Sequence, residues 1–498
     1  MDTAYPIRVA ASKFRQRDAL VYRGHRLTFG QLDQQIDRLA RGFVEAGLHG
    51  KTIASVLHND PRTICLFLAA ARAGAVTVPI NNRLTASEIS FIVKDSDAEV
   101  LFIDREIFDG VPGLQELLPE TVRPVVLEAE YDGGTEEFGG FLGPASPDEF
   151  AVDIDEGSPA TIIYTSGTSG FPKGVVRSHT ANLWAIANSL IGSPRSPDGD
   201  VELFALPLFG IGFIYQVMPT LLSGGTVVLD RAFDPRRTWE ILAGESVTRC
   251  FLAPTMIAAL LDIEEQEAFD VSALKTILVA YEFSERLRNR AIERFGNVFI
   301  NMYGLTEAQL CAGAPNDFAT DPTAAGRPMG LARVRIVDSD FRPLPQGEVG
   351  EIGFETPAAM TEYKGLDEET QRVVRGSMVM TGDLGYLDED GALHFAGRRK
   401  EIIKSGGFSI DPVEIENAIH ELEFVTEAAV VGLKDERWGE RVVAFVVTDD
   451  GTEDDEAVRQ HCRARLAAFK VPKEVRFLPT LPKNATGKIQ RAGLRAQP

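Results

Sequence analysis

The chain has 498 residues, of which 44% are hydrophobic and 25% are charged, and its formal net charge is −22. This length predicts more than one domain, and the apolar and charged fractions are those of an ordinary globular protein. The negative charge argues against nucleic acid or an anionic membrane as a partner, because such partners select basic surfaces. A protein this acidic that binds a nucleotide must therefore concentrate a few cations at the binding site.

Segments with helical and strand-like patterns alternate along the first part of the chain. Apolar residues recur at helical spacing over residues 29–46, and short apolar runs follow at residues 52–57 and 76–79. Further units of a helix followed by a strand are predicted at residues 86–103, 239–252 and 284–300. This order predicts α/β layers built on largely parallel sheets.

Residues 203–228 carry no charge and form a run long enough for a membrane helix. The run is interrupted by Pro207, Pro219, Gly210, Gly212, Gly224 and Gly225. We therefore predict no membrane span, and interpret the run as a buried strand, a loop, a helix and a second strand at Thr226–Leu229.

The four cysteines, Cys65, Cys250, Cys311 and Cys462, show no metal-binding or redox spacing. We expect buried free thiols in a reducing compartment. The first residues lack the apolar core of a secretory signal, so the predicted location is the cytoplasm.

The second part of the chain has a different pattern. Strand-like, turn-rich segments at residues 334–337, 350–355, 386–387 and 392–396 predict a smaller β-rich subdomain. A charged stretch with glycines on either side, residues 397–404, predicts a boundary between an N-terminal domain (1–399) and a C-terminal domain (400–498). The latter is predicted as a compact α+β unit, with helices at 412–422 and 454–468 and strands at 425–431 and 441–447.

The strongest chemical signal is the sequence Tyr-Thr-Ser-Gly-Thr-Ser-Gly-Phe-Pro-Lys-Gly at residues 164–174. Small hydroxyl residues and glycines let backbone N–H groups approach an anion closely. The candidate phosphate-binding residues are Thr165, Ser166, Gly167, Thr168, Ser169, Gly170 and Lys173. Because Gly174 follows the lysine, this is not a Walker A loop, and the composition alone would also fit a flexible surface loop.

This loop resembles the phosphate loop of the adenylate-forming superfamily, which holds acyl- and aryl-CoA synthetases, peptide-synthetase adenylation domains and firefly luciferase. The resemblance runs in family order from about Phe29 to Arg491 and is closest to stand-alone acyl-CoA ligases. It implies a large N-terminal domain of layered α/β subdomains with a β-rich subdomain, and a small mobile C-terminal domain. It also implies ATP (or a supplied acyl-AMP), Mg²⁺ and coenzyme A as cofactors and substrates.

Two further motifs carry the nucleotide site of this family. The sequence Asn-Met-Tyr-Gly-Leu-Thr-Glu at residues 301–307 resembles the family's second core motif. By this resemblance Tyr303 stacks on adenine, Thr306 touches the α-phosphate and Glu307 helps to hold Mg²⁺, which prefers hard carboxylate oxygens. Asp383, in a Thr-Gly-Asp sequence, resembles the aspartate that binds both ribose hydroxyls.

Residues 397–407 resemble the interdomain hinge motif. The resemblance places Arg398 near the ribose and phosphates, Lys400 at the hinge, and Gly407 beside the pantetheine tunnel. Near the C-terminal end, Lys488 resembles the adenylation lysine, whose ammonium would bridge the carboxylate and the α-phosphate.

The chain departs from the family at three places. Val-Ala-Tyr-Glu-Phe at residues 279–283 replaces small residues beside adenine, where larger side chains would crowd the nucleotide unless they turn into the core. Gly210, after Phe209, replaces a frequent histidine and opens space at the predicted acyl pocket, and Met380 replaces a frequent arginine. Residues 206–213 lack the acid that would pair the ammonium of an α-amino acid, so such a substrate is not expected. The largely apolar pocket lining around Phe209–Met218 predicts a hydrophobic acyl group, with room for a bulky one.

These motifs predict an acid–CoA ligase that forms an acyl-adenylate and then a thioester. The sequence at 279–283 also suggests a ligase impaired in adenylation, which would convert a supplied acyl-adenylate to acyl-CoA. The same motifs fit an acyl-adenylate ligase that loads a carrier protein in trans, a luciferase-like oxidation and, outside the enzymes, an adenylate-binding sensor.

Overall fold

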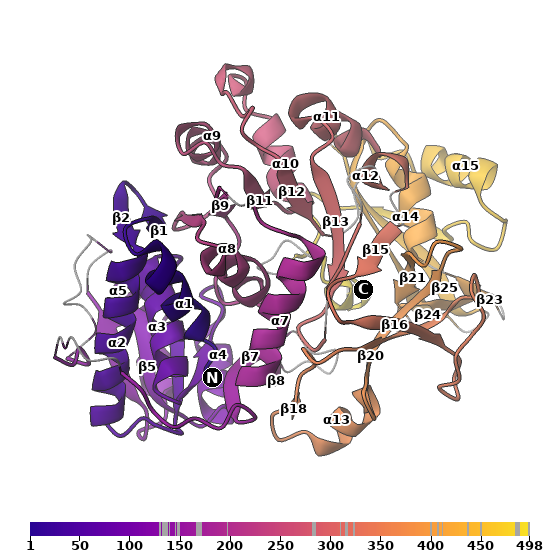
Figure 1. The fold of residues 1–498 in the computed structure, drawn as a ribbon. Coiled ribbons are helices and arrows are strands. Elements are labelled where there is room, and N and C mark those ends of the chain that lie inside the picture. The colour runs from indigo at the N-terminus through magenta and orange to yellow at the C-terminus, as the bar shows by residue number, and fades with distance from the viewer. Residues whose placement is uncertain are drawn as a thin grey trace.

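A computed structural model of the chain describes residues 1–128, 131, 138, 140–144, 146, 150–165, 172–196, 198–280, 285–308, 310–313, 317–321, 324–398, 401–405, 408–410, 412–435, 438–448, 451–483 and 489–496. Within this described part, the strands form three sheets with helices packed against them (Figure 1). The predicted α/β class is confirmed.

The first sheet lies in the N-terminal part of the chain. Its strands are, in order, β18 (Glu362–Tyr363), β8 (Lys173–Ser178), β7 (Pro159–Thr165), β4 (Val76–Pro79), β3 (Thr52–Val56), β5 (Ala98–Asp104) and β6 (Arg123–Leu127). The strands from β7 to β6 are parallel, whereas β8 and β18 are antiparallel to their neighbours. Its helices are α2 (Phe29–Glu45), α3 (Pro61–Arg72), α4 (Ala86–Asp95), α5 (Arg105–Gly110) and α6 (Leu114–Leu117).

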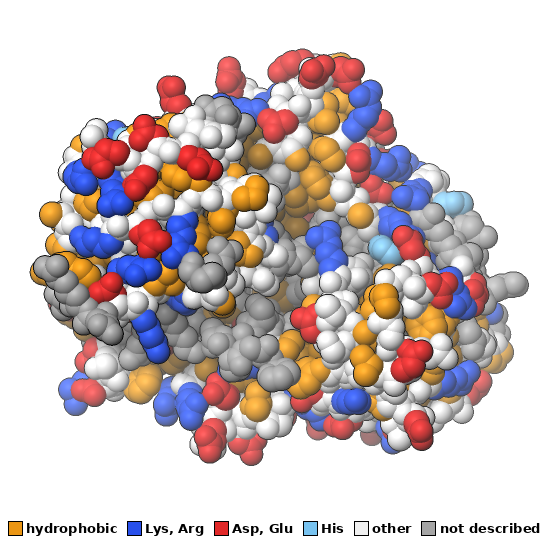
Figure 2. All heavy atoms as spheres, turned by 180° about the vertical axis from the view of Figure 1, so that it is seen from behind, with side chains coloured by type: hydrophobic (Ala, Val, Ile, Leu, Met, Phe, Trp, Pro, Cys, Tyr) orange, Lys and Arg blue, Asp and Glu red, His pale blue; other side chains and the backbone are white. Residues whose placement is uncertain are grey.

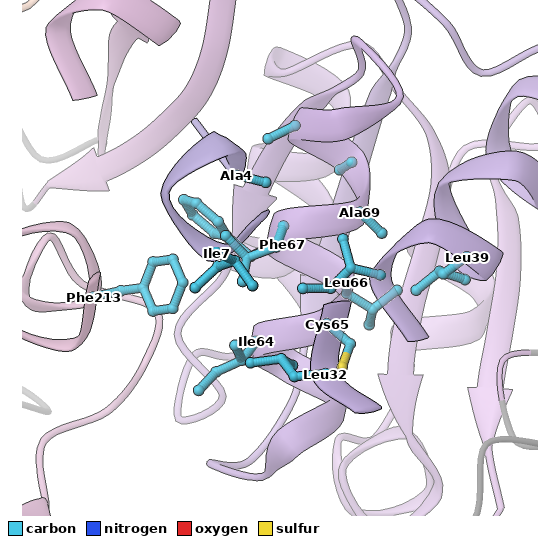
Figure 3. Packing of buried hydrophobic residues seen from close by; sticks show 14 of the residues in the cluster. Ala4, Ile7, Leu32, Leu39, Ile64, Cys65, Leu66, Phe67, Ala69 and Phe213 are labelled. Atoms are coloured by element: carbon cyan, nitrogen blue, oxygen red, sulfur yellow. The ribbon is translucent and has the colours of Figure 1, made fainter. Parts of the chain in front are cut away.

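Helices α2 and α3 show how local sequence determines where the helices beside this sheet begin and which residues they bury. Thr28 caps α2 in a capping box with Gln31, and the buried residues of α2 recur at helical spacing. Helix α3 is buried along almost its whole length, in a core that includes residues of α1 (Tyr5–Phe14). In Figure 3, Phe67 of α3 faces Phe213, and their ring centroids are 4.3 Å apart.

The second sheet joins a parallel and an antiparallel half. Its strands are, in order, β16 (Arg333–Val337), β17 (Gly350–Glu355), β20 (Met378–Leu387), β21 (Leu393–Arg398), β15 (Ala324–Pro328), β14 (Leu310–Ala312), β13 (Phe299–Gly304), β12 (Thr276–Val279), β11 (Arg249–Phe251), β9 (Val201–Phe204), β10 (Thr226–Leu229), β1 (Asp18–Tyr22) and β2 (His25–Thr28), with β19 (Val374–Arg375) beside β20. Strands β13 to β1 are parallel, and those from β14 to β16 are antiparallel, as predicted for the β-rich subdomain. The associated helices are α9 (Pro235–Gly244), α10 (Pro254–Leu261), η2 (Gln266–Ala268), α11 (Glu285–Phe295), α12 (Asp317–Thr320) and α13 (Asp367–Val373).

Helix α7 (His179–Gly192) follows β8 directly and lies near the middle of the molecule in Figure 1. The opposite face of the molecule is hollowed near its middle, and hydrophobic side chains gather on the walls of this hollow (Figure 2).

The uncharged run at residues 203–228 folds as predicted. Strand β9 ends at Phe204, a loop follows, and a π-helix, η1 (Phe213–Val217), continues into α8 (Met218–Leu222) before β10. The π-helix itself was not predicted. Of the described helices, none is sufficiently long and apolar to cross a membrane.

The third sheet belongs to the C-terminal part of the chain. Its strands are β23 (Phe408–Ile410), β22 (Ile403–Ser405), β25 (Gly439–Thr448), β24 (Val425–Asp435) and β26 (Glu474–Phe477), with helices α14 (Pro412–His420), α15 (Asp455–Arg465) and α16 (Arg491–Arg495). The chain passes from the second sheet to the third between Arg398 and Ile403. A domain boundary at residues 399 and 400 agrees with this passage and stays a prediction.

The four cysteines are buried and free, as predicted. Burial raises the pKa of each thiol, that of Cys462 to about 11. They are therefore protonated and unreactive at neutral pH.

Candidate active site

The predicted phosphate loop connects two antiparallel strands, β7 and β8. Thr165, the last residue of β7, lies opposite Lys173, the first residue of β8. The hairpin therefore returns the lysine to the threonine at the base of the loop. Residues 166–171 lie outside the described residues, so the anion-binding roles of Ser166, Gly167, Thr168, Ser169 and Gly170 stay predictions.

The ammonium of Lys173 has two neighbours from the segment formed by β18 and α13. Its Nζ lies 2.5 Å from Oε2 of Glu369 and 5.3 Å from the centre of the Tyr363 ring. Because β18 pairs with β8, with Tyr363 opposite Val175, this segment lies beside the hairpin at the lower edge of the molecule in Figure 1.

Glu307 contacts the hydroxyl of the same tyrosine. The hydroxyl of Tyr363 donates a hydrogen bond to Oε1 of Glu307, with a distance of 2.8 Å. Burial, together with the negative charge of Glu307, raises the pKa of Tyr363, so the hydroxyl keeps its proton and remains a donor. One side chain thus connects the predicted phosphate-binding cation with the predicted metal-binding carboxylate.

The backbone around Glu307 is held by three donors from different elements. Arg177 of β8 donates to the carbonyl of Thr306 (2.9 Å), the N–H of Met360 donates to the carbonyl of Glu307 (2.7 Å), and the Tyr215 hydroxyl donates to the carbonyl of Ala308 (2.8 Å). Three successive carbonyls are therefore fixed, which orients the side chains of Thr306 and Glu307.

Arg177 is fully buried, and burial lowers the pKa of its guanidinium. It also donates to the Asn182 side chain (2.9 Å) and lies over the Tyr215 ring. The nearby charge of Glu307 acts in the opposite direction and favours the charged guanidinium. Tyr215 belongs to η1, so Arg177 and Tyr215 connect the predicted acyl-binding segment with the motif at residues 301–307.

Tyr303 and Asp383 lie together, as expected for two parts of one nucleoside site. The Tyr303 hydroxyl donates to Oδ2 of Asp383 at 2.8 Å, and its ring lies 6.2 Å from the Phe354 ring with 25° between the planes. Burial, with Asp383 adding to it, holds the pKa of Tyr303 well above its ordinary value. The Asp383 N–H donates to the Thr381 hydroxyl (3.0 Å), and Arg398 pairs with Asp383 across β20 and β21.

The predicted acyl-binding segment divides into two parts. Phe209 and Gly210 are half-buried, and a Cβ added at Gly210 would meet only the Pro207 carbonyl oxygen, 3.9 Å away, so space is open there. By contrast, the side chains from Phe213 to Met218 are all buried, and most of them join the hydrophobic core. The accessible part of the predicted pocket lining is therefore the loop between β9 and η1.

Asn59 fixes this loop. Its Nδ2 donates to the carbonyl of Leu206 and its Oδ1 accepts from the N–H of Leu208, both at 2.8 Å. The two bonds hold the backbone on either side of Pro207, directly before Phe209.

Several predicted residues lie outside the described part of the chain. These are Lys400, Gly407 and Lys488, together with residues 281–283 beside the adenine site. Their roles stay predictions. The third departure, Met380, is buried in β20, and its sulfur lies against Gly353 of β17, where it serves packing.

Three residues of the site, Tyr363, Glu369 and Arg177, were not predicted from the sequence. Tyr215 lies within the predicted acyl-pocket lining, but its contacts with Arg177 and the Ala308 carbonyl were not predicted. A local signal exists only for Arg177, a lone charge after the apolar Val175 and Val176. The acidic residues of α13 give no such signal, because their proximity to Lys173 depends on the pairing of β18 with β8.

The donor set also bears on a metal. Among the described residues, no three His, Cys, Asp or Glu side chains form a cluster that would enclose a metal ion. Glu307 therefore offers a single carboxylate. This suits Mg²⁺, which keeps several waters and takes further ligands from phosphate oxygens.

The fold is that of an adenylate-forming enzyme, as comparison with known proteins shows. Residues 7–364 match the AMP-binding enzyme family, and residues 414–488 match the AMP-binding enzyme C-terminal domain. The chain therefore belongs to the AMP-binding enzyme family.

Similar proteins catalyse related reactions. The fatty acid–[acyl-carrier-protein] ligase ScoC of Streptomyces coeruleorubidus is 34% identical over 489 residues, which cover 96% of this chain and 92% of that protein. Feruloyl-CoA synthase of an Amycolatopsis species is 34% identical over 488 residues, covering 96% and 95%. The solved structure of the amide bond synthetase McbA from Marinactinospora thermotolerans has a TM-score of 0.89 at 29% identity and covers 99% of both chains.

The resemblance inferred from the sequence motifs is thus confirmed, as are the predicted fold and the enzyme class, an AMP-forming acyl-CoA ligase. Enzymes of this class use ATP and coenzyme A and proceed through an acyl-adenylate.

Proposed function

We propose that this protein joins a hydrophobic carboxylic acid, with room for a bulky one, to coenzyme A through an acyl-adenylate. The observation that carries this proposal is the position of Tyr363. Its hydroxyl donates a hydrogen bond to Glu307, and its ring faces Lys173. The carboxylate expected to hold Mg²⁺ and the ammonium expected to bind the polyphosphate therefore lie beside the same side chain. This is the arrangement that a metal-bound polyphosphate requires.

In the first half-reaction an oxygen of the substrate carboxylate attacks the α-phosphorus of ATP, and pyrophosphate leaves. Lys173 would bind the polyphosphate, while Tyr303 stacks on adenine and Asp383 accepts the ribose hydroxyls. Glu307 would hold Mg²⁺, which supplies charge neutralisation at the phosphates when bound. Lys488 would stabilise the charge that develops, and removal of such a group typically costs on the order of 10²–10³ in rate.

In the second half-reaction the thiolate sulfur of coenzyme A attacks the acyl carbon, and AMP leaves. The C-terminal domain would rotate about Lys400 between the two steps and bring Gly407 to the pantetheine tunnel, because one site then serves both reactions.

The exposed aromatic side chains of Phe408 and Trp438 in the C-terminal part of the chain support an acceptor that contains a nucleotide. Phe408, 51% exposed, stacks on Phe469 with ring centroids 4.2 Å apart. Trp438, 36% exposed, has the Lys473 ammonium 5.4 Å from its ring centre. Exposed aromatic faces beside lysines suit an adenine ring with attached phosphates.

The loop from Leu206 to Gly212 supports a hydrophobic acyl group. The loop contains no charged residue, and Gly210 leaves space where a side chain would project. An α-amino acid would bring an ammonium that this loop leaves unpaired, at a high cost in free energy.

Acid-dependent exchange of pyrophosphate into ATP tests the first half-reaction. Robust exchange with a cognate acid is expected, and it would exclude an enzyme that only consumes a supplied acyl-adenylate. Lys488→Ala should abolish acid-driven turnover but spare thioester formation from added acyl-AMP. Equal loss of both activities would contradict this division of roles.

A carrier protein is the second candidate acceptor, because a relative that is 34% identical is a fatty acid–[acyl-carrier-protein] ligase. Competition between coenzyme A and a phosphopantetheinylated carrier protein for the same acyl-adenylate decides between the two. Faster transfer to coenzyme A supports our proposal, and transfer to the carrier alone would replace it.

A further inference from the structure

Lys173, the cation of the phosphate loop, is already bound to a carboxylate. Its Nζ lies 2.5 Å from Oε2 of Glu369, and the exposed fractions of the two side chains are 15% and 35%. Incoming phosphate oxygens would need the same ammonium, so Glu369 and the polyphosphate compete for one cation.

Glu369 is held in place by its own surroundings. Its second oxygen, Oε1, accepts a hydrogen bond from Nη1 of Arg372 at 2.8 Å. The Thr370 hydroxyl accepts from the N–H of Tyr363 (2.9 Å) and so ties α13 to β18. Because β18 pairs with β8, the helix that carries Glu369 is fixed to the strand that carries Lys173.

The free energy of the Lys173–Glu369 ion pair determines how strongly it opposes polyphosphate binding. Partly exposed ion pairs stabilise a protein only weakly, and their loss changes an equilibrium by about two- to fivefold. A polyphosphate carries several negative charges and would displace a single carboxylate. When it leaves, Arg372 keeps Glu369 close enough to bind the lysine again.

We propose that Glu369 is an exchangeable counter-ion of Lys173. It pairs with the Lys173 ammonium in the nucleotide-free enzyme and is displaced by the polyphosphate of ATP. It pairs with the ammonium again as pyrophosphate leaves. This inference rests on the proposed function. It adds a residue that weakens nucleotide binding and assists the release of pyrophosphate.

The matched variants are Glu369→Gln and Glu368→Gln. Both remove one negative charge from α13, but Glu368 is 89% exposed and pairs with Arg372 at 3.3 Å. E369Q should lower the dissociation constant of ATP and that of inorganic pyrophosphate by about two- to fivefold relative to E368Q. The difference should shrink at about 1 M salt, where the Debye length is roughly 3 Å.

Calorimetric titration measures binding without turnover, and thermal melting checks that both variants fold. Glu369→Asp keeps the charge and should stay closer to the wild type than E369Q. Equal affinities in E369Q and E368Q, or weaker binding in E369Q, would overturn the inference while leaving the proposed function intact. If the wild type bound neither ATP nor pyrophosphate, this inference and the proposed function would both fail.

Discussion

The hydroxyl of Tyr363 donates a hydrogen bond to the Glu307 carboxylate at 2.8 Å, and these two residues come from segments 56 positions apart. Glu307 ends the second core motif, whereas Tyr363 lies in the short strand that pairs with the phosphate-loop hairpin. The bond therefore fixes the orientation of the carboxylate relative to β8, the strand that begins with Lys173.

Tyr363→Phe should weaken Mg²⁺ binding. A hydrogen bond to a charged group contributes about 1.5–3 kcal/mol, so its loss should raise the Mg²⁺ concentration at half-maximal pyrophosphate exchange at least about tenfold. Tyr386→Phe, which alters a ring stacked on His394, is the control. An unchanged Mg²⁺ dependence in Y363F would show that Tyr363 does not position Glu307.

Asp383→Asn should reduce the preference for ATP over 2′-deoxy-ATP. The carboxylate is 2% exposed and accepts from Tyr303, and an amide in its place offers only one acceptor oxygen. We expect the ratio of kcat/KM for the two nucleotides to fall about tenfold, the effect of about 1.4 kcal/mol. Tyr303→Phe removes only the hydroxyl and should keep the preference. A ratio unchanged in D383N would contradict a ribose-binding role.

Gly210→Leu should narrow the range of acids. The added side chain would fill the open space at this position, where a Cβ meets only the Pro207 carbonyl. We expect kcat/KM for bulky aromatic acids to fall at least about tenfold while short-chain acids are spared, because filling a pocket excludes large groups first. Gly244→Leu, also in open space but at the end of α9, is the control. An equal loss for all acids would argue against an acyl pocket here.

The stability of the protein should fall on mild acidification, because of His179. Burial lowers the pKa of this histidine, although Asp2, Asp155 and Glu156 act in the opposite direction. Its Nδ1 accepts a hydrogen bond from the N–H of Thr3 at 3.1 Å, and protonation would break that bond.

The sign of this pH dependence follows from proton binding. The unfolded chain takes up a proton near pH 6.5, whereas the folded protein does so only at lower pH. The free energy of unfolding should therefore decrease as the pH falls through 6.5. Urea denaturation at several pH values measures this decrease, which His179→Asn should reduce and His25→Asn, at an exposed position, should not. A pH dependence of stability that H179N leaves unchanged would contradict the role of His179.

Local patterns predicted most of the elements. Helical spacing over residues 29–46 corresponds to α2, and the α+β pattern after residue 404 corresponds to the third sheet with α14 and α15. The glycines within 203–228 correctly marked the turns on either side of the helical segment, whereas Pro219 lies in the first turn of α8, where proline is tolerated.

The surroundings of the motif residues were not predictable in the same way. Lys173 was predicted from its loop, but its contact with Glu369 spans 196 positions and depends on a two-residue strand pairing with β8. Arg177 was not predicted because its role arises from packing between β8 and η1. Such contacts depend on how sheets and helices assemble, and this information is absent from any single motif.

The most direct test of the two-step reaction is a mass-spectrometric time course that follows acyl-AMP and acyl-CoA separately for a panel of hydrophobic acids. With ATP and Mg²⁺ alone, acyl-AMP should accumulate to about one equivalent per enzyme. After coenzyme A is added, acyl-AMP should disappear as acyl-CoA and AMP form in equal amounts. Acyl-CoA formation only when acyl-AMP is supplied, or acyl-AMP that persists in the presence of coenzyme A, would contradict the proposed reaction.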